Sequence, residues 1–183
     1  MINIVTLNND RSKTCCFTGH RPEKIYGGIS FGSQPMKRLL SVVALHISDL
    51  VTKQGYDTFI TGMQRGIDLW AAQLVLDMKK RYPYLKVICA MPYRGHGEDF
   101  EGLDLWLFHT VIEDAKQVVY VSENYSDNCM RKRNMFMVDH SSFVLGVMSD
   151  KHSGTGMTVN YAKKQGVDHH VIDLNENAPM FFA

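Results

Sequence analysis

The chain has 183 residues, 45% of them hydrophobic, which is enough for one well-packed domain but too little for two. Its formal net charge of +1 lacks the basic excess typical of general nucleic-acid binders, so we expect such binding to be unlikely. The four cysteines have no CxxC spacing, and we find neither a signal-peptide pattern nor an apolar run of membrane-spanning length. These features predict a cytoplasmic protein with reduced thiols and no membrane partner.

The first predicted elements are a strand, a loop and a long helix. We expect residues 1–12 to be a loosely held terminus and residues 13–17 to form the first strand. Thr18-Gly19-His20-Arg21-Pro22 then makes a turn, because proline prevents a helix from continuing there. Apolar residues at helical spacing predict a helix over about 35–53, which Gly55 would end.

A second strand is joined to a helix by the segment Thr61-Gly-Met-Gln-Arg-Gly-Ile-Asp68. Gly62 and Gly66 bracket a tight turn, and the helix is predicted from Ile67 to about residue 81. Such a turn leaves the first N–H groups of the helix available to an anion, usually a phosphate. The alternative is a plain turn that needs glycine only for its positive φ. Asp68 would either cap the helix or contact a sugar.

The remainder of the chain continues to alternate between strands and helices. Strands are predicted at 85–91, 118–121, 142–148 and 170–174, and helices at 100–115, from 126 onward and at 158–165. The apolar stripe of the helix at 100–115 is formed by Leu103, Trp106, Leu107, Val111 and Ile112. Residues 175–183 are expected to be loosely held. This alternation predicts a single α/β domain over 1–183, with about six mostly parallel strands and helices on both faces.

Glycine-containing turns fall at three predicted strand ends, at Gly19, at Gly62–Gly66 and at Gly154–Gly156. Ligands of such sheets bind at the carboxyl ends of the strands. Thr155 and Thr158 would donate hydroxyl groups to a phosphate or cap the following helix. Together the turns favour a shared anion pocket, although neither a GxGxxG nor a Walker A sequence is present.

Further candidates surround this predicted pocket. His20 and Arg21 would contact a ribose or base, and Arg131 would pair bidentately with a phosphate while Lys132 faces water. The spacing of His96, Glu98 and Asp99 matches no recognised ligand set, so we predict no metal site.

Three stretches together resemble the SLOG superfamily, and in particular its YpsA-like family. They are Cys16-Phe-Thr-Gly-His-Arg-Pro-Glu-Lys24, Thr61-Gly-Met-Gln-Arg-Gly-Ile-Asp-Leu-Trp-Ala-Ala72 and residues 131–158. The resemblance implies a Rossmann-like fold and a pocket for nucleotides or nucleotide-derived ligands. The central glycine-rich turn also resembles that of the DNA-processing protein DprA.

The segment Arg131-Lys-Arg-Asn-Met135 and the later Gly-Thr-Gly-Met-Thr158 are similar to motifs of the lonely-guy (LOG) phosphoribohydrolases. Arg131 fits the arginine of those enzymes and Thr158 fits the threonine, but Tyr161 occupies the place of the glutamate. A tyrosine, with an ordinary pKa of about 10, supplies no carboxylate at neutral pH, which argues against LOG-type catalysis.

Three functional hypotheses follow. The first is a sensor or regulatory protein that binds a nucleotide-type ligand such as AMP, ADP-ribose or an NAD-like molecule, requires no cofactor and forms a homo-oligomer. The second is a hydrolase that cleaves the N-glycosidic bond of a nucleoside monophosphate, with Glu98 or Asp99 replacing the missing glutamate. The third is a protein-interaction regulator without a ligand. We favour a protein that is not an enzyme.

Overall fold

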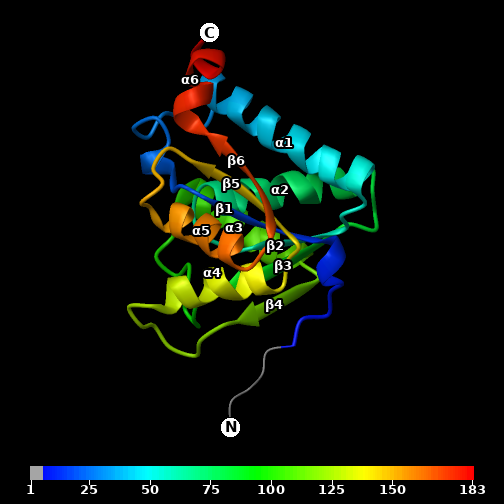
Figure 1. Cartoon of the computed structure of the whole chain (residues 1–183). Coiled ribbons are helices and arrows are strands. Elements are labelled where there is room, and N and C mark those ends of the chain that lie inside the picture. The colour runs from blue at the N-terminus through cyan, green and yellow to red at the C-terminus, as the bar shows by residue number, and fades with distance from the viewer. Residues whose placement is uncertain (1–5) are drawn as a thin grey trace.

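The computed structural model describes residues 6–183 and contains one sheet of six parallel strands in the order β4-β3-β2-β1-β5-β6. The strands are β1 (Thr14–Gly19), β2 (Thr58–Thr61), β3 (Lys86–Met91), β4 (Gln117–Tyr120), β5 (Phe143–Met148) and β6 (Asp168–Asp173). The predicted Rossmann-like α/β fold is therefore confirmed (Figure 1).

Helices cover both faces of this sheet. They are α1 (Gln34–Gln54), α2 (Ile67–Lys79), α3 (Gly102–Asp114), α4 (Cys129–Asp139), α5 (Gly154–Lys164) and α6 (Leu174–Phe182). Side chains of α1, α2 and α3 join one apolar core, while those of α4 and α5 join a second. Cys15 and Cys16, neighbours on β1, enter the first and second core respectively, as the alternation of side chains along a strand requires.

The order of the strands reverses beside β1. The chain steps from β1 to β4 in one direction, and α4 then returns it to β5 on the other side of β1. In sheets of this kind, ligands bind outside the carboxyl ends of the strands at the point of reversal. The topology therefore directs attention to the turns that follow β1 and β5.

The prediction that residues 175–183 are loosely held is wrong. They form most of α6, which lies beside α1 at one end of the molecule (Figure 1). Phe181 is completely buried, its ring packs edge-on against Tyr26 at 6.3 Å, and Arg38 Nη1 donates to its carbonyl oxygen at 3.1 Å. The segment has too few apolar residues to show a helical period in the sequence. Tertiary packing holds it in place.

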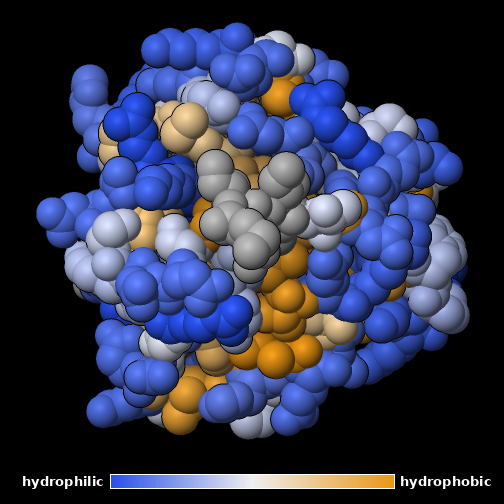
Figure 2. Space-filling view, turned by 90° about the horizontal axis from the view of Figure 1, so that it is seen from below, coloured by the Kyte–Doolittle hydropathy of each residue, from blue (hydrophilic) through white to orange (hydrophobic). Residues whose placement is uncertain are grey.

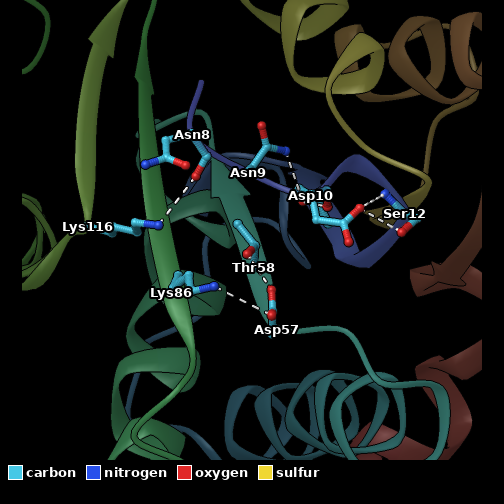
Figure 3. Close-up of polar contacts among 9 residues, drawn as sticks. Asn8, Asn9, Asp10, Ser12, Asp57, Thr58, Lys86 and Lys116 are labelled. Carbon is cyan, nitrogen blue, oxygen red and sulfur yellow. Dashed lines mark hydrogen bonds and ion pairs between the residues drawn. The ribbon is translucent and has the colours of Figure 1, made fainter. Parts of the chain in front are cut away.

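The expected loose terminus at 1–12 lies partly outside the described residues, which begin at 6. Within the described part, residues 8–12 are fixed near the amino ends of the strands (Figure 3). Asn9 Nδ2 donates to Thr14 Oγ1 at 2.9 Å, and Lys116 Nζ donates to the carbonyl oxygen of Asn8 at 3.4 Å. The Lys86–Asp57 ion pair, at 3.5 Å, lies in the same region. This part of the segment is therefore ordered by side-chain contacts.

The predicted apolar stripe of α3 is only partly buried. Leu107 and Val111 are buried as expected, but Leu103 is 44% exposed and Trp106 is 60% exposed. Phe108, which was not part of the predicted stripe, is buried. The helix carries apolar residues around more than one face, and among the described residues its main contacts are with α2 and β3. The sequence alone does not fix which face that is.

Trp106→Ala is expected to change the free energy of unfolding by no more than about 0.5 kcal/mol, because an exposed side chain has little contact area to lose. Urea unfolding of the variant and the parent measures the difference. A loss of about 2 kcal/mol or more, as for a buried leucine, would show that this ring is packed against the core.

Strand β4 is an edge of the sheet, and Val118 within it and Val121 just after it are only half-buried. Seen from below, where β4 lies in Figure 1, the surface is mostly hydrophilic, and its most extensive hydrophobic area lies near the centre of the view (Figure 2). The free side of an edge strand can pair with a further strand. This face lies away from the turns that follow β1 and β5.

Candidate functional site

A cavity of about 340 Å³ opens at the carboxyl ends of β1, β2 and β5. This size is within the range of roughly 300–1,000 Å³ that is typical of small-molecule sites. Its walls come from three turns and one face of α4, and they are formed by Thr18, Gly19, His20, Arg21, Glu23, Lys24, Gln64, Asp68, Met130, Arg133, Asn134, Ser153, Gly154 and Thr155. The structure thus brings together turns that are far apart in the sequence, as predicted for a shared pocket.

The turn between β2 and α2 packs against the turn that follows β1. Gly66 has φ +91° and ψ −133°, a conformation that is essentially restricted to glycine. The N–H of Ile67 donates to the carbonyl oxygen of His20 at 3.3 Å. The first amide of α2 is therefore hydrogen-bonded within the protein and is not available to the anion predicted at this helix terminus.

Gly62 allows two side chains to approach the backbone at the end of β2. A Cβ atom at this position would overlap the guanidinium of Arg133 and lie 2.6 Å from Asp68 Oδ2. The requirement for glycine here is one of space, because the residue does not have a positive φ. Gly19 has the same function for Ile67, whose side chain occupies the space of the missing Cβ.

Asp68 is the one buried carboxylate among the described residues that line the cavity. Burial raises its pKa to about 6, although the nearby Arg133 acts in the opposite direction. Asp68 is therefore more than a helix cap, because it is a buried carboxyl group with a raised pKa. At physiological pH such a carboxyl group is mostly ionised and accepts hydrogen bonds, and it gains a proton as the pH falls through about 6.

Arg133 is the cationic group in the interior of the site. It is 4% exposed, its Nε donates to Asn134 Oδ1 at 2.7 Å, and its Nη2 approaches Met130 Sδ at 3.8 Å. Its Nη1 is buried and has no hydrogen-bond partner anywhere in residues 6–183. A buried donor without a partner is costly, so this group is suited to an acceptor supplied by a ligand.

Arg131, which was predicted to pair with a phosphate, is exposed and lines a second cavity. The sequence also carried a signal for the burial of Arg133. Cys129, Arg133 and Met137 are spaced four residues apart, and all three are buried on the inner face of α4. Lys132 is exposed, as expected.

Helix α5 begins at Gly154, four residues before the predicted start. Ser153 caps it, because its Oγ accepts a hydrogen bond from the N–H of Gly156 at 3.2 Å. Gly154 and Thr155, in the first turn, line the cavity, where helix amides lack partners within the helix. The N-terminus of α5 therefore faces the same cavity as Arg133.

Thr158 does not have a free hydroxyl group. Its Oγ1 donates to the carbonyl oxygen of Gly154 at 2.9 Å and accepts from Asn134 Nδ2 at 2.9 Å. It connects α5 to α4 and so positions Asn134, which in turn orients Arg133. Gly156 lies behind the cavity, where a Cβ would overlap the backbone of Lys151.

His20 joins the turn after β1 to the end of β5. Its Nε2 accepts a hydrogen bond from the N–H of Ser149 at 3.0 Å, which requires the neutral ring. Burial lowers the pKa of His20, in agreement with that role. Arg21, beside it, is exposed at the mouth of the cavity.

Glu98 and Asp99 are exposed in the loop after β3 and do not line the cavity. His96 in that loop is buried, contacts the carbonyl oxygen of Met63 at 2.9 Å and packs against aromatic rings, so it holds the loop in place. Within residues 6–183, no group of three or more His, Cys, Asp or Glu side chains is arranged to hold a metal ion. None of the described helices is long and apolar enough to cross a membrane.

The cavity thus lies where the strand order of a Rossmann-like sheet reverses, beside a helix N-terminus and a buried arginine. The YpsA family model, described as the YspA SLOG family, matches residues 15–177. The chain belongs to this family, which confirms the resemblance found in the sequence.

Relatives and solved structures agree with this assignment. The SPbeta prophage-derived protein YoqJ of Bacillus subtilis strain 168 is 29% identical over 152 residues, which are 76% of this chain and 89% of YoqJ. A UPF0398 protein of Ligilactobacillus salivarius is 28% identical over 138 residues, which are 70% of this chain and 75% of that protein.

Two solved structures of DNA processing protein A share the fold at a TM-score of 0.58. The protein from Streptococcus pneumoniae is 16% identical; the match covers 86% of this chain, which spans about half (49%) of that protein. The protein from Helicobacter pylori is 18% identical, with 93% of this chain and 73% of that protein covered, and its structure is described as showing a single-stranded DNA binding mode.

Proposed function

We propose that the cavity binds a nucleotide or nucleotide-derived molecule through its phosphate, and that the chain acts as a ligand-responsive regulatory protein. The observation that carries this proposal is the buried Arg133 Nη1, which has no partner among the described residues. It shares the cavity with the first turn of α5. A phosphate placed between them would accept hydrogen bonds from the guanidinium and from the helix amides.

The position of Asp68 favours a ligand that has a ribose beside its phosphate. Its carboxyl group faces the same cavity, and a carboxylate is a good acceptor for ribose hydroxyl groups. The exposed Arg21 and Lys24 add positive charge at the mouth, which suits an anionic ligand. AMP, ADP-ribose and NAD are therefore the first ligands to test.

A hydrolase of N-glycosidic bonds is the second candidate, and Asp68 is the observation that favours it. With Glu98 and Asp99 outside the cavity, Asp68 is the buried carboxyl group placed to activate water. Its pKa of about 6 is close to that of an effective general base. If the chain hydrolyses AMP to adenine and ribose 5-phosphate, Asp68→Asn is the variant that removes the reaction while binding persists.

Ligand binding is tested by thermal and urea unfolding of the parent, Arg133→Met and Lys132→Ala with AMP, ADP-ribose or NAD. A ligand at a hundredfold excess over its Kd stabilises the parent by about 2.7 kcal/mol. Arg133→Met is expected to weaken binding by about tenfold or more, because it removes a charged donor from the interior of the site. Lys132→Ala, one residue away on the exposed side of α4, should bind like the parent.

Two results would contradict the proposal. If no nucleotide stabilises the parent, the chain is better explained as a protein-interaction regulator without a ligand. If a single-stranded oligonucleotide binds and the small nucleotides do not, the activity named for the H. pylori neighbour applies here despite the net charge of +1.

A further inference from the structure

A second cavity, of about 500 Å³, lies between α4 and α5. The lining residues recur at helical spacing on both helices, so the cavity is a groove along their line of contact. We call it the α4–α5 groove; it is lined by Asp127, Met130, Arg131, Asn134, Met135, Gly154, Met157, Thr158, Asn160, Tyr161 and Lys164.

The floor of this groove is apolar and adaptable. Met130 and Met135 are half-buried in it, and Met157 is 58% exposed. The ring of Tyr161 is held along one side, because its hydroxyl donates to Asp139 Oδ1 at 2.8 Å. Flexible thioethers beside a fixed aromatic ring suit a flat, polarizable group such as a nucleobase.

The α4–α5 groove adjoins the cavity that contains Arg133. Met130, Asn134 and Gly154 line both spaces. Asn134 stands at the junction, with its Oδ1 accepting from Arg133 on one side and its Nδ2 donating to Thr158 on the other. A molecule whose phosphate contacts Arg133 and whose other end lies in the groove would pass beside the Asn134–Thr158 hydrogen bond.

The charge of the groove disfavours one alternative occupant. Among the described residues, Arg131 and Lys164 line it against Asp127, and on the same two helices Lys132 and Lys163 are exposed against Asp139. A second copy of the chain would bring the same basic face against it, which like charges oppose. An anionic ligand matches this charge.

We propose that the α4–α5 groove is the base-binding part of the nucleotide site, so that the ligand is a nucleoside phosphate and not a phosphorylated sugar. This inference rests on the proposed function, because it requires the phosphate to occupy the cavity at Arg133. Met157 and Tyr161 then set the preference for the base, and Arg133 holds the phosphate that every ligand of the site shares.

The test compares AMP with ribose 5-phosphate, which has the same phosphate and sugar but lacks the base. Affinities of both are measured by NMR titration, which also reports weak binding, for the parent, Met157→Glu, Arg133→Met and Met180→Glu. Met157→Glu places a negative charge in the groove, and its exposed position should allow the chain to fold. Met180→Glu, 49% exposed on α6, is the matched control.

We expect Met157→Glu to weaken AMP binding by about tenfold or more, as the loss of a base contact does, and to leave ribose 5-phosphate within about twofold of the parent. Arg133→Met should weaken both, and Met180→Glu neither. In the parent, AMP should bind at least about tenfold more tightly than ribose 5-phosphate.

The outcomes separate the two proposals. If AMP binds but Met157→Glu leaves its affinity unchanged, or ribose 5-phosphate binds equally well, the base lies elsewhere and this inference alone is wrong. If neither compound binds, this inference is wrong, and the proposed function fails with it when ADP-ribose and NAD do not bind either. If Met157→Glu converts a dimer into a monomer in sedimentation, the groove is an interface between copies and the inference is overturned.

Discussion

Gly66→Ala is expected to lower the free energy of unfolding by about 3 kcal/mol or more and to abolish ligand binding. At φ +91° and ψ −133° an alanine is strained by about 1–3 kcal/mol. Its Cβ would also lie 2.5 Å from the carbonyl oxygen of His20, and backbone cannot move aside as a flexible side chain does. The two turns that form one wall of the cavity would be forced apart. Urea unfolding and nucleotide titration of the variant measure both effects.

Gly55→Ala is the control for this prediction. Gly55 ends α1 with φ +76° and ψ 20°, and no atom lies within 4 Å of an added Cβ. Gly55→Ala should lower the free energy of unfolding by only about 1 kcal/mol, which is the ordinary penalty of alanine in a left-handed cap. If Gly66→Ala is no more destabilising than Gly55→Ala, the turn does not need glycine for its contact with His20.

Asp68→Asn is expected to change how stability depends on pH. The pKa of Asp68 is raised from 3.8 to about 6 in the folded chain, so between these pH values the folded state holds a proton that the unfolded state has lost. The stabilisation from this group is complete below pH about 4 and is lost as the pH rises through about 6. The loss is about 3 kcal/mol for a change of about two pKa units.

The asparagine variant lacks this titration. Its stability relative to the parent should therefore rise between pH 4 and 6 by about 3 kcal/mol and stay constant above that range. Urea unfolding of both proteins at intervals of half a pH unit gives the difference. A difference that does not vary with pH would mean that the pKa of Asp68 is ordinary in the folded protein. Water would then hydrate its carboxyl group inside the cavity.

The alternation of strands and helices was predictable because apolar periods and glycine turns are local signals. The start of α5 was not, because Gly154 and Gly156 indicate a loop by their low helix propensity. The structure favours glycine at 156 for another reason, since a Cβ would overlap the backbone of Lys151. Tertiary contact thus overrides local preference at that helix terminus.

The candidate site was predictable to a similar extent. Gly19, Gly62, Gly66, Asp68, Gly154 and Thr155 lie in or beside the turns that the topology gathers, and short turns leave little freedom in where they point. Arg133 was missed because three consecutive basic residues of a helix differ by about 100° in direction. Only the burial of Cys129 and Met137 on the same face fixes the rotation of α4.

The four buried thiols have a consequence for the motions of the folded chain. Cys15, Cys16, Cys89 and Cys129 are all free and buried, and burial raises the pKa of both Cys16 and Cys89 to about 12. Alkylating reagents attack the thiolate and need access to it, so such thiols react only when the surrounding structure opens. Cys129 begins α4 on the same buried face as Arg133, whereas Cys15 and Cys16 lie in the middle of the sheet. The labelling rates of these cysteines therefore report separately how often the ligand-binding side opens and how often the whole molecule does.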